Sequence, residues 1–125
     1  MLIEGKPGLG KSTLALMLVD RGAAFVADDG VVLETRGKVL IASPVPATRG
    51  LLEVRNLGLI ELPTAASVRV ALVLTLSDAA PRFVENAGGT TIEGCSIPHL
   101  MLTPKDPALA IKAELALARY GLPDP

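Results

Sequence analysis

Aromatic residues are almost absent from this 125-residue sequence, which has no tryptophan, one tyrosine and two phenylalanines. Single-stranded nucleic acids are usually held by stacked aromatic rings, and a net charge of −1 offers no basic surface to a polyanion. We therefore predict no nucleic-acid partner and no anionic-membrane partner. The core must be built from Ala, Val, Leu and Ile, a composition typical of strands buried on both faces beneath helices.

Cysteine and long apolar runs are also scarce. The single cysteine, Cys95, excludes an intramolecular disulfide framework and a thiolate zinc site, and we predict that it is an inert buried thiol. The longest apolar run is Leu14–Val19, far short of the roughly 20 residues that cross a membrane. No secretory signal comes before the first motif. These absences favour one cytoplasmic globular domain over residues 1–125, long enough to bury its own core.

The sequence does contain a phosphate-binding loop. The residues that fit its pattern, G-x-x-x-x-G-K-[ST], are Gly5, Lys6, Pro7, Gly8, Leu9, Gly10, Lys11 and Ser12, and we assign them, with Thr13, to nucleotide binding. Gly8 and Gly10 let the backbone curl so that its N–H groups face an anion. Lys11 brings a positive charge to the β and γ phosphates, and the Ser12 hydroxyl can ligate Mg²⁺. A strand end before the loop and a helix after it support this interpretation.

The rest of the pattern predicts an α/β fold with a mixed sheet. We expect a helix at Lys11–Arg21, strands at Ala23–Ala27, Val31–Glu34, Lys38–Ala42, Leu57–Glu61, Val68–Leu76 and Pro98–Thr103, and a helix at Ala108–Tyr120. The segment Asp78–Ser96 is rich in glycine and is predicted to be a mobile loop. Four residues share the expected apolar face of the last helix: Ala108, Ile111, Leu115 and Ala118.

Two adjacent carboxylates follow the strand predicted after the first helix. Asp28 and Asp29 come 17 and 18 residues after Lys11, where a strand beside the loop's own strand delivers side chains to the phosphate edge of the sheet. One carboxylate can face Mg²⁺ while the other accepts a proton from an attacking hydroxyl. The alternative interpretation is an ordinary Asp-Asp-Gly turn.

Several stretches together resemble one known family. They are Gly5–Ser12, Asp20–Gly22, Val26–Asp29 and Leu52–Ile60, and they resemble the C-terminal catalytic domain of HPr kinase/phosphorylase, in the short form that lacks the N-terminal domain. The resemblance implies a P-loop kinase domain with a mixed β-sheet, of the phosphoenolpyruvate-carboxykinase-like fold. It further implies an enzyme that uses ATP and Mg²⁺ to phosphorylate a serine of the phosphocarrier protein HPr, and a homo-oligomer, since the family forms hexamers.

The resemblance also implies roles for individual residues. Lys11 matches the lysine that holds phosphate, and Ser12 matches the ligand of Mg²⁺. Asp29 matches the proton acceptor of the kinase reaction, and Glu53 matches a metal-ligand carboxylate, with Asp28 as a further metal candidate.

A catalytic arginine is implied in the same way. Arg82 matches it because its spacing to Ile97-Pro98 is that of the family. A guanidinium group there would neutralise charge on the transferring phosphoryl group. By its own sequence context Arg82 is only a basic residue in a loop.

Several positions depart from the family pattern. Asn56 stands where the family usually has glycine, and Pro7 replaces a small polar residue. In the segment that supports the reverse, phosphorylase reaction, two family arginines are replaced by Lys105 and Ala108. Because a lysine cannot form the bidentate fork of an arginine, the kinase direction is favoured.

The largest departure lies before the phosphate loop. The family has a strand and a catalytic histidine there, whereas this sequence has only Met1–Glu4, so we expect that it is truncated at its start. The single histidine, His99, is predicted to be a non-catalytic surface residue. Two other interpretations stay open: a small-molecule kinase or general P-loop NTPase, and a non-catalytic ATP-binding regulator.

Overall fold

The computed structural model describes residues 1–28 and 30–123 of the chain. Its helices and strands follow one another as β1 (Leu2–Gly5), α1 (Lys11–Asp20), β2 (Val31–Arg36), β3 (Val39–Pro44), β4 (Leu51–Val54), β5 (Gly58–Glu61), β6 (Val68–Arg69), β7 (Val73–Leu76), β8 (Gly88–Ile92), β9 (Cys95–Leu102) and α2 (Leu109–Tyr120). A short 3-10 turn at Pro46–Thr48 lies between β3 and β4.

The main sheet has four strands in the order β1-β7-β9-β8. Strands β1, β7 and β9 run parallel, with Gly5 opposite Leu76 and Leu76 opposite Leu102 at their carboxyl ends. Strand β8 is antiparallel to β9, so the predicted mixed sheet is confirmed. Because three parallel strands end at the same level, the loops that follow them begin side by side at one edge.

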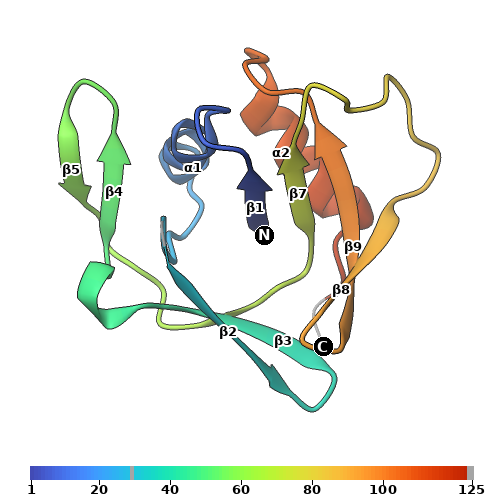
Figure 1. Ribbon diagram of the computed structural model, residues 1–125, viewed down its shortest axis with the longest axis horizontal. Coiled ribbons are helices and arrows are strands. Elements are labelled where there is room, and N and C mark those ends of the chain that lie inside the picture. Colours follow the sequence, from blue (N-terminus) through green and yellow to red (C-terminus); the bar gives the residue numbers. More distant parts are fainter. Residues whose placement is uncertain (29, 124–125) are drawn as a thin grey trace.

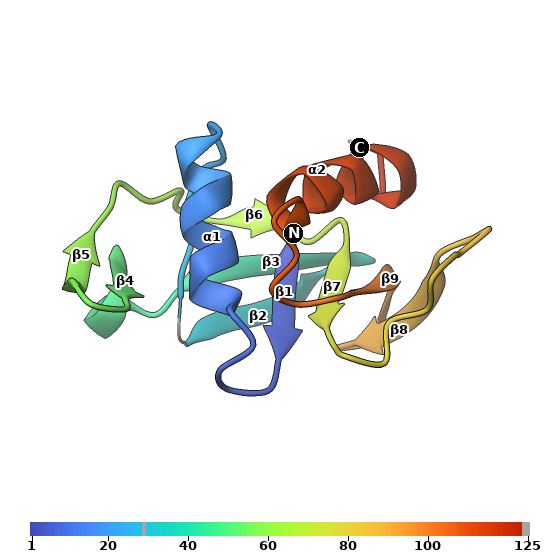
Figure 2. The ribbon, with the colours of Figure 1, turned by 90° about the horizontal axis from the view of Figure 1, so that it is seen from above.

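Each face of this sheet is covered by a different layer (Figures 1 and 2). Helices α1 and α2 cover one face, where a core forms around Leu14, Leu74 and Ala113. The small sheet β2-β3-β6 covers part of the other face, where Leu40 and Val73 belong to a second core. In the described residues both cores consist of aliphatic side chains and the buried Cys95, as the scarcity of aromatic residues predicted.

Two predicted strands differ from the structure. Ala23–Ala27 forms no strand, and only Phe25 makes an isolated bridge to Thr64. The predicted strand Val68–Leu76 divides into β6 and β7, which belong to different sheets. Val70 packs in one core and Leu72 in the other, so the connection between the strands is as buried as the strands themselves. The apolar run therefore continues through the break, and hydrophobicity cannot reveal it.

The last third of the chain brings two further corrections. The second half of the predicted loop Asp78–Ser96 is β8, whose glycines pair with β9 although glycine usually weakens a strand. The predicted apolar face of the last helix is also wrong, because Ile111 is 47% and Leu115 63% exposed. The buried face carries Leu109 and several alanines, whose small side chains let α2 approach the sheet closely.

Strands β4 and β5 form a separate hairpin beside α1, although only its second strand was predicted. Leu52 is fully buried on the side of the hairpin that faces α1. Asn56, in the turn, has φ of 75°, a left-handed conformation that asparagine adopts more readily than most residues. This conformation explains why asparagine can stand at a position where the family usually has glycine.

Gly50, just before β4, faces Leu62, just after β5, at the open end of the hairpin, and this contact gives a prediction for stability. Gly50 has φ of 80°, and a Cβ atom there would lie 2.9 Å from the Leu62 carbonyl oxygen. We expect Gly50→Ala to lower the free energy of unfolding by about 2 kcal/mol or more, from backbone strain and overpacking together. Gly37→Ala is the matched control, since Gly37 also has positive φ but open space around it, and should cost only about 1 kcal/mol. If urea unfolding gave equal losses of unfolding free energy for the two variants, the short distance between position 50 and the Leu62 carbonyl oxygen would not be the cause.

Candidate functional site

The phosphate loop connects β1 to α1 at the carboxyl edge of the main sheet. Gly8 and Gly10 have φ of 85° and 93°, the left-handed conformation that the curled backbone requires. Gly10 is the N-cap of α1, and in the described part of the chain no side chain caps the helix with a hydrogen bond. The amides of the first turn and the positive end of the helix therefore form a cradle for an anion.

The other loop residues have simple positions. Gly5 ends β1, Lys6 and Pro7 are exposed, and Leu9 packs against the core between the sheet and the helices. Lys11, Ser12 and Thr13 form the first turn of α1. Lys11 is half-buried, and within the described part of the chain its ammonium makes no ion pair. Among the described residues, therefore, no carboxylate neutralises its charge.

Asp28 lies directly beside this loop. Its Oδ1 accepts a hydrogen bond from the Ser12 hydroxyl at 2.7 Å. Its Oδ2 accepts a bond from the backbone N–H of Glu53, on β4, at 3.3 Å. The carboxylate therefore joins three separate segments of the chain: the start of α1, the segment before β2, and the hairpin.

This donor set fits Mg²⁺. A serine hydroxyl and an aspartate carboxylate are the hard oxygen ligands that Mg²⁺ prefers, usually completed by substrate phosphates and water. Glu53 contributes its backbone N–H to the arrangement, while its side chain is exposed. Among the described residues no three His, Cys, Asp or Glu side chains gather into a metal site. Of the described residues, Ser12 and Asp28 could hold such an ion together with substrate phosphates.

The two other predicted catalytic residues are Asp29 and Arg82. Asp29 lies outside the described residues. Arg82 is exposed on the loop that follows β7, at the same edge as the phosphate loop, and it lines a groove against α2. Over the described ranges no hydrogen bond or ion pair joins Arg82 to the phosphate loop.

Three polar side chains of the main sheet, those of Glu4, Thr75 and His99, form a hydrogen-bonded row that the sequence did not predict. Thr75 donates a hydrogen bond to Glu4 Oε1 at 3.1 Å and lies 2.7 Å from His99 Nε2. A hydroxyl has one proton to donate, so Nε2 of His99 must be the donor to Thr75. His99 is half-buried, which corrects the predicted surface position. These residues come together only because of the order of the strands in the sheet, so the sequence alone could not predict their hydrogen bonds.

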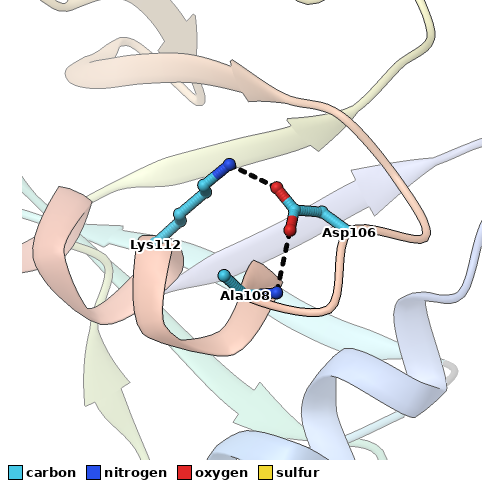
Figure 3. A network of polar contacts seen from close by, with 3 residues as sticks. All are labelled: Asp106, Ala108 and Lys112. Atoms are coloured by element: carbon cyan, nitrogen blue, oxygen red, sulfur yellow. Dashed lines mark hydrogen bonds and ion pairs between the residues drawn. The ribbon is translucent and has the colours of Figure 1, made fainter.

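The segment before α2 holds a second polar network (Figure 3). Asp106 pairs with the Lys112 ammonium and accepts a hydrogen bond from the Ala108 N–H at 2.8 Å. The pKa of Asp106 lies below its ordinary value, mainly because Lys112 donates a hydrogen bond to the carboxylate and secondarily because Ala108 does. Lys105, next to it, has φ of 62°. The network thus ties the start of α2 to the loop that follows β9.

This network predicts a pH dependence of stability. Because the folded pKa of Asp106 is lowered, its stabilising effect is complete above the unfolded value of about 3.9 and is lost as pH falls through the folded pKa. We expect Asp106→Asn to lower the thermal midpoint near pH 7 and to approach the parent chain as the pH falls below the folded pKa of Asp106. Asp78→Asn, in an exposed loop, is the control and should leave the midpoint unchanged. A difference that persists unchanged into acid would contradict the ionic origin.

Taken together, the fold and the site define a P-loop α/β domain, with an anion cradle at the end of a parallel strand and an aspartate bonded to the serine of the loop. The family model for the HPr Serine kinase C-terminal domain matches residues 1–87 of the sequence. The chain belongs to this family.

Individual relatives agree with this assignment. An HPr kinase/phosphorylase of Clostridium novyi is 36% identical over 137 aligned residues, covering 98% of this chain and 45% of the relative. One of Clostridium tetani is 49% identical over 65 residues, covering 51% of this chain and 21% of the relative. The structure of an Hpr(Ser) kinase/phosphatase from Coxiella burnetii superposes with a TM-score of 0.82 and 25% identity, covering 93% of this chain and 83% of that one.

The relatives are longer than this chain. It spans less than half the length of the Clostridium novyi protein. Neither helix in the described part of the chain is long and apolar enough to cross a lipid bilayer.

Proposed function

We propose that this domain transfers the γ-phosphate of ATP, bound with Mg²⁺, to a serine of an HPr-like phosphocarrier protein. The observation that carries the proposal is the bond between Ser12 and Asp28 at the mouth of the phosphate loop. It joins the two protein groups that suit Mg²⁺ at the point where the loop would hold the β and γ phosphates. Membership of the family supports the choice of substrate.

Each residue has a defined task in this proposal. The amides at the start of α1 and the Lys11 ammonium hold the phosphates, while Ser12 and Asp28 hold the metal. Bound Mg²⁺ supplies charge neutralisation on the phosphate oxygens. Asp29 accepts the proton of the attacking serine hydroxyl, and Arg82 faces the charge on the transferring group. Glu53 keeps Asp28 oriented through its backbone N–H.

We further propose that the kinase direction predominates over the phosphorylase direction. Lys105 and Ala108 replace the two arginines that the family uses in the reverse reaction. The nearby Lys112 is paired with Asp106 and offers no free cation in their place. The proposed setting is the cytoplasm, where the enzyme would work as a homo-oligomer.

One experiment tests the substrate directly. The purified chain is incubated with γ-labelled ATP, Mg²⁺ and an HPr carrier, and the carrier is analysed for phosphoserine. We expect label on one serine, and none when that serine is replaced by alanine. Transfer to a metabolite but not to the carrier would establish a small-molecule kinase. ATP binding without any transfer would overturn the proposed kinase activity of this chain and favour a non-catalytic ATP-binding regulator.

A further inference from the structure

The hydrogen-bonded row of Glu4, Thr75 and His99 has no task in the proposed reaction. It lies close to the edge of the main sheet from which the phosphate loop starts, since Glu4 directly precedes Gly5. Strands β1, β7 and β9, which carry the three residues, are neighbours in the sheet (Figure 1). The row therefore connects the base of the phosphate loop to the single histidine of the sequence.

The three side chains lie on the face of the sheet that carries the second core. Each member of the row comes two positions after an apolar residue of that core on the same strand, and residues two apart share a face. These apolar residues are Leu2, Val73 and Ile97. The row thus lies just beyond the core, toward the carboxyl ends of the strands. There Thr75 and His99 are half-buried and Glu4 is exposed.

Glu4 is the charged group that the row joins to His99. Strand β7 contributes a neutral hydroxyl, and β8 places Gly88, which has no side chain, opposite His99. The small sheet β2-β3-β6 brings aliphatic side chains to this face, and α2 packs on the other face. The loops after β1 and β7 carry two more charges near their starts, the exposed Lys6 and Asp78, which water and salt screen.

The direction of the hydrogen bonds depends on the protons of the imidazole ring. A protonated imidazole donates from both ring nitrogens, so Nε2 always donates to Thr75, and the Thr75 hydroxyl donates to Glu4. A neutral imidazole carries one ring proton. When this proton is on Nδ1, Nε2 accepts the proton of Thr75 and Glu4 loses its donor. Protonation of His99 therefore fixes the row and offsets the negative charge of Glu4.

We infer that His99 is a positioning residue for the phosphate loop and that its protonation strengthens nucleotide binding there. A carboxylate at the base of the loop repels the phosphates, and a cation bonded to it through Thr75 reduces this repulsion. Because the favourable state is the protonated one, the gain is present at low pH and is lost as the pH rises through the titration of the imidazole. For partly screened charges we expect a gain in ATP affinity of about threefold between pH 8 and pH 5. The inference rests on the proposed function only for the choice of ATP.

An NMR titration of the untagged chain tests the row, because a single histidine gives one set of imidazole signals. The Cε1–H signal of His99 is followed from about pH 5 to pH 8, with and without saturating ATP and excess Mg²⁺. By linkage, a gain of about threefold in affinity requires ATP to raise the titration midpoint by about 0.5 pH unit. Thr75→Ser retains the hydroxyl and should show the parental shift, whereas Thr75→Val breaks the row and should show about half of it or less. Thr91→Val, at an exposed threonine of β8 outside the row, is the matched control and should behave as the parent chain does.

Two further variants give independent readouts. Glu4→Gln should lower the titration midpoint of His99 in the free protein, because it removes the carboxylate that favours the imidazolium. It should also tighten ATP binding at pH 8 by about threefold, since the repulsion at the base of the loop is gone. His99→Gln retains a side-chain N–H donor but cannot titrate, so the ratio of parental to variant ATP affinity should fall as the pH rises from about 5 to 8.

Two results would overturn the inference: a midpoint that ATP leaves unmoved in the parent chain, or an equal shift in folded Thr75→Val. If circular dichroism shows that Thr75→Val is unfolded, Glu4→Gln decides in its place, and an unchanged midpoint in the free variant overturns the row. The titration involves no carrier protein. A chain that binds ATP with the expected shift but transfers no phosphate therefore overturns the kinase proposal alone, and a chain that binds no ATP overturns both.

Discussion

The Asp29→Asn variant is expected to transfer phosphate to serine about 10² to 10⁴ times more slowly than the parent chain while binding ATP equally well. An amide cannot accept the proton of the attacking hydroxyl, whereas the cradle for the phosphates depends on other residues. Asp29 directly follows Asp28, whose carboxylate is bonded to Ser12 beside the phosphate loop. The prediction follows from the match of Asp29 to the proton acceptor of the family and from its place next to Asp28 in the sequence.

Single-turnover transfer and ATP binding should be measured on the same preparations. Asp20→Asn is the matched control, because Asp20 is an exposed aspartate at the far end of α1. It should leave both quantities at the parental values. Undiminished transfer by Asp29→Asn would remove this residue from the mechanism. A simultaneous loss of ATP binding would show that it acts on the nucleotide instead.

The Asp28→Ala variant is expected to lose about 100-fold or more in kcat/KM and to require a higher Mg²⁺ concentration for the transfer that remains. The substitution removes the acceptor of two hydrogen bonds, one from the Ser12 hydroxyl and one from the Glu53 N–H. The serine would then lose its hydrogen-bond partner, and the proposed metal site would lose the carboxylate of Asp28. The rate and the metal dependence should change together.

A double-mutant cycle with Ser12→Ala distinguishes this coupling from two independent effects. Residues in direct contact give non-additive losses, so the double variant should be little worse than the more damaging single one. Losses that simply add in free energy would mean that Asp28 and Ser12 act separately. An unchanged Mg²⁺ requirement in Asp28→Ala would remove Asp28 from the metal site.

The parts of the site that could be predicted are those encoded in adjacent residues. The phosphate loop needs glycines, a lysine and a serine within eight positions, so its pattern is visible without a fold. The spacing from Lys11 also pointed to Asp28, which does lie beside the loop, although the strand expected before it does not form. The groove around Arg82 was not predictable, because α2 lies far from Arg82 in the sequence.

The fold shows the same division. The two helices and the β2–β3 hairpin were predicted because their patterns and stop signals are local. The predicted apolar face of α2 was wrong because Ile111 and Leu115 look like core residues, whereas alanines occupy the contact. In this helix close packing mattered more than the hydrophobicity of each side chain.

By itself, the sequence determined that this protein carries a phosphate loop on a helix, an aliphatic core and a mixed sheet, because these features depend on residue type and short spacing. Only the tertiary structure decided that the strand predicted at Val68–Leu76 is divided between two sheets. It also decided that Asp28 links Ser12 to β4 through hydrogen bonds. The contacts among Glu4, Thr75 and His99 were decided in the same way. The physical reason is that such contacts form between segments distant along the chain, and the packing of the two layers selects which of them meet.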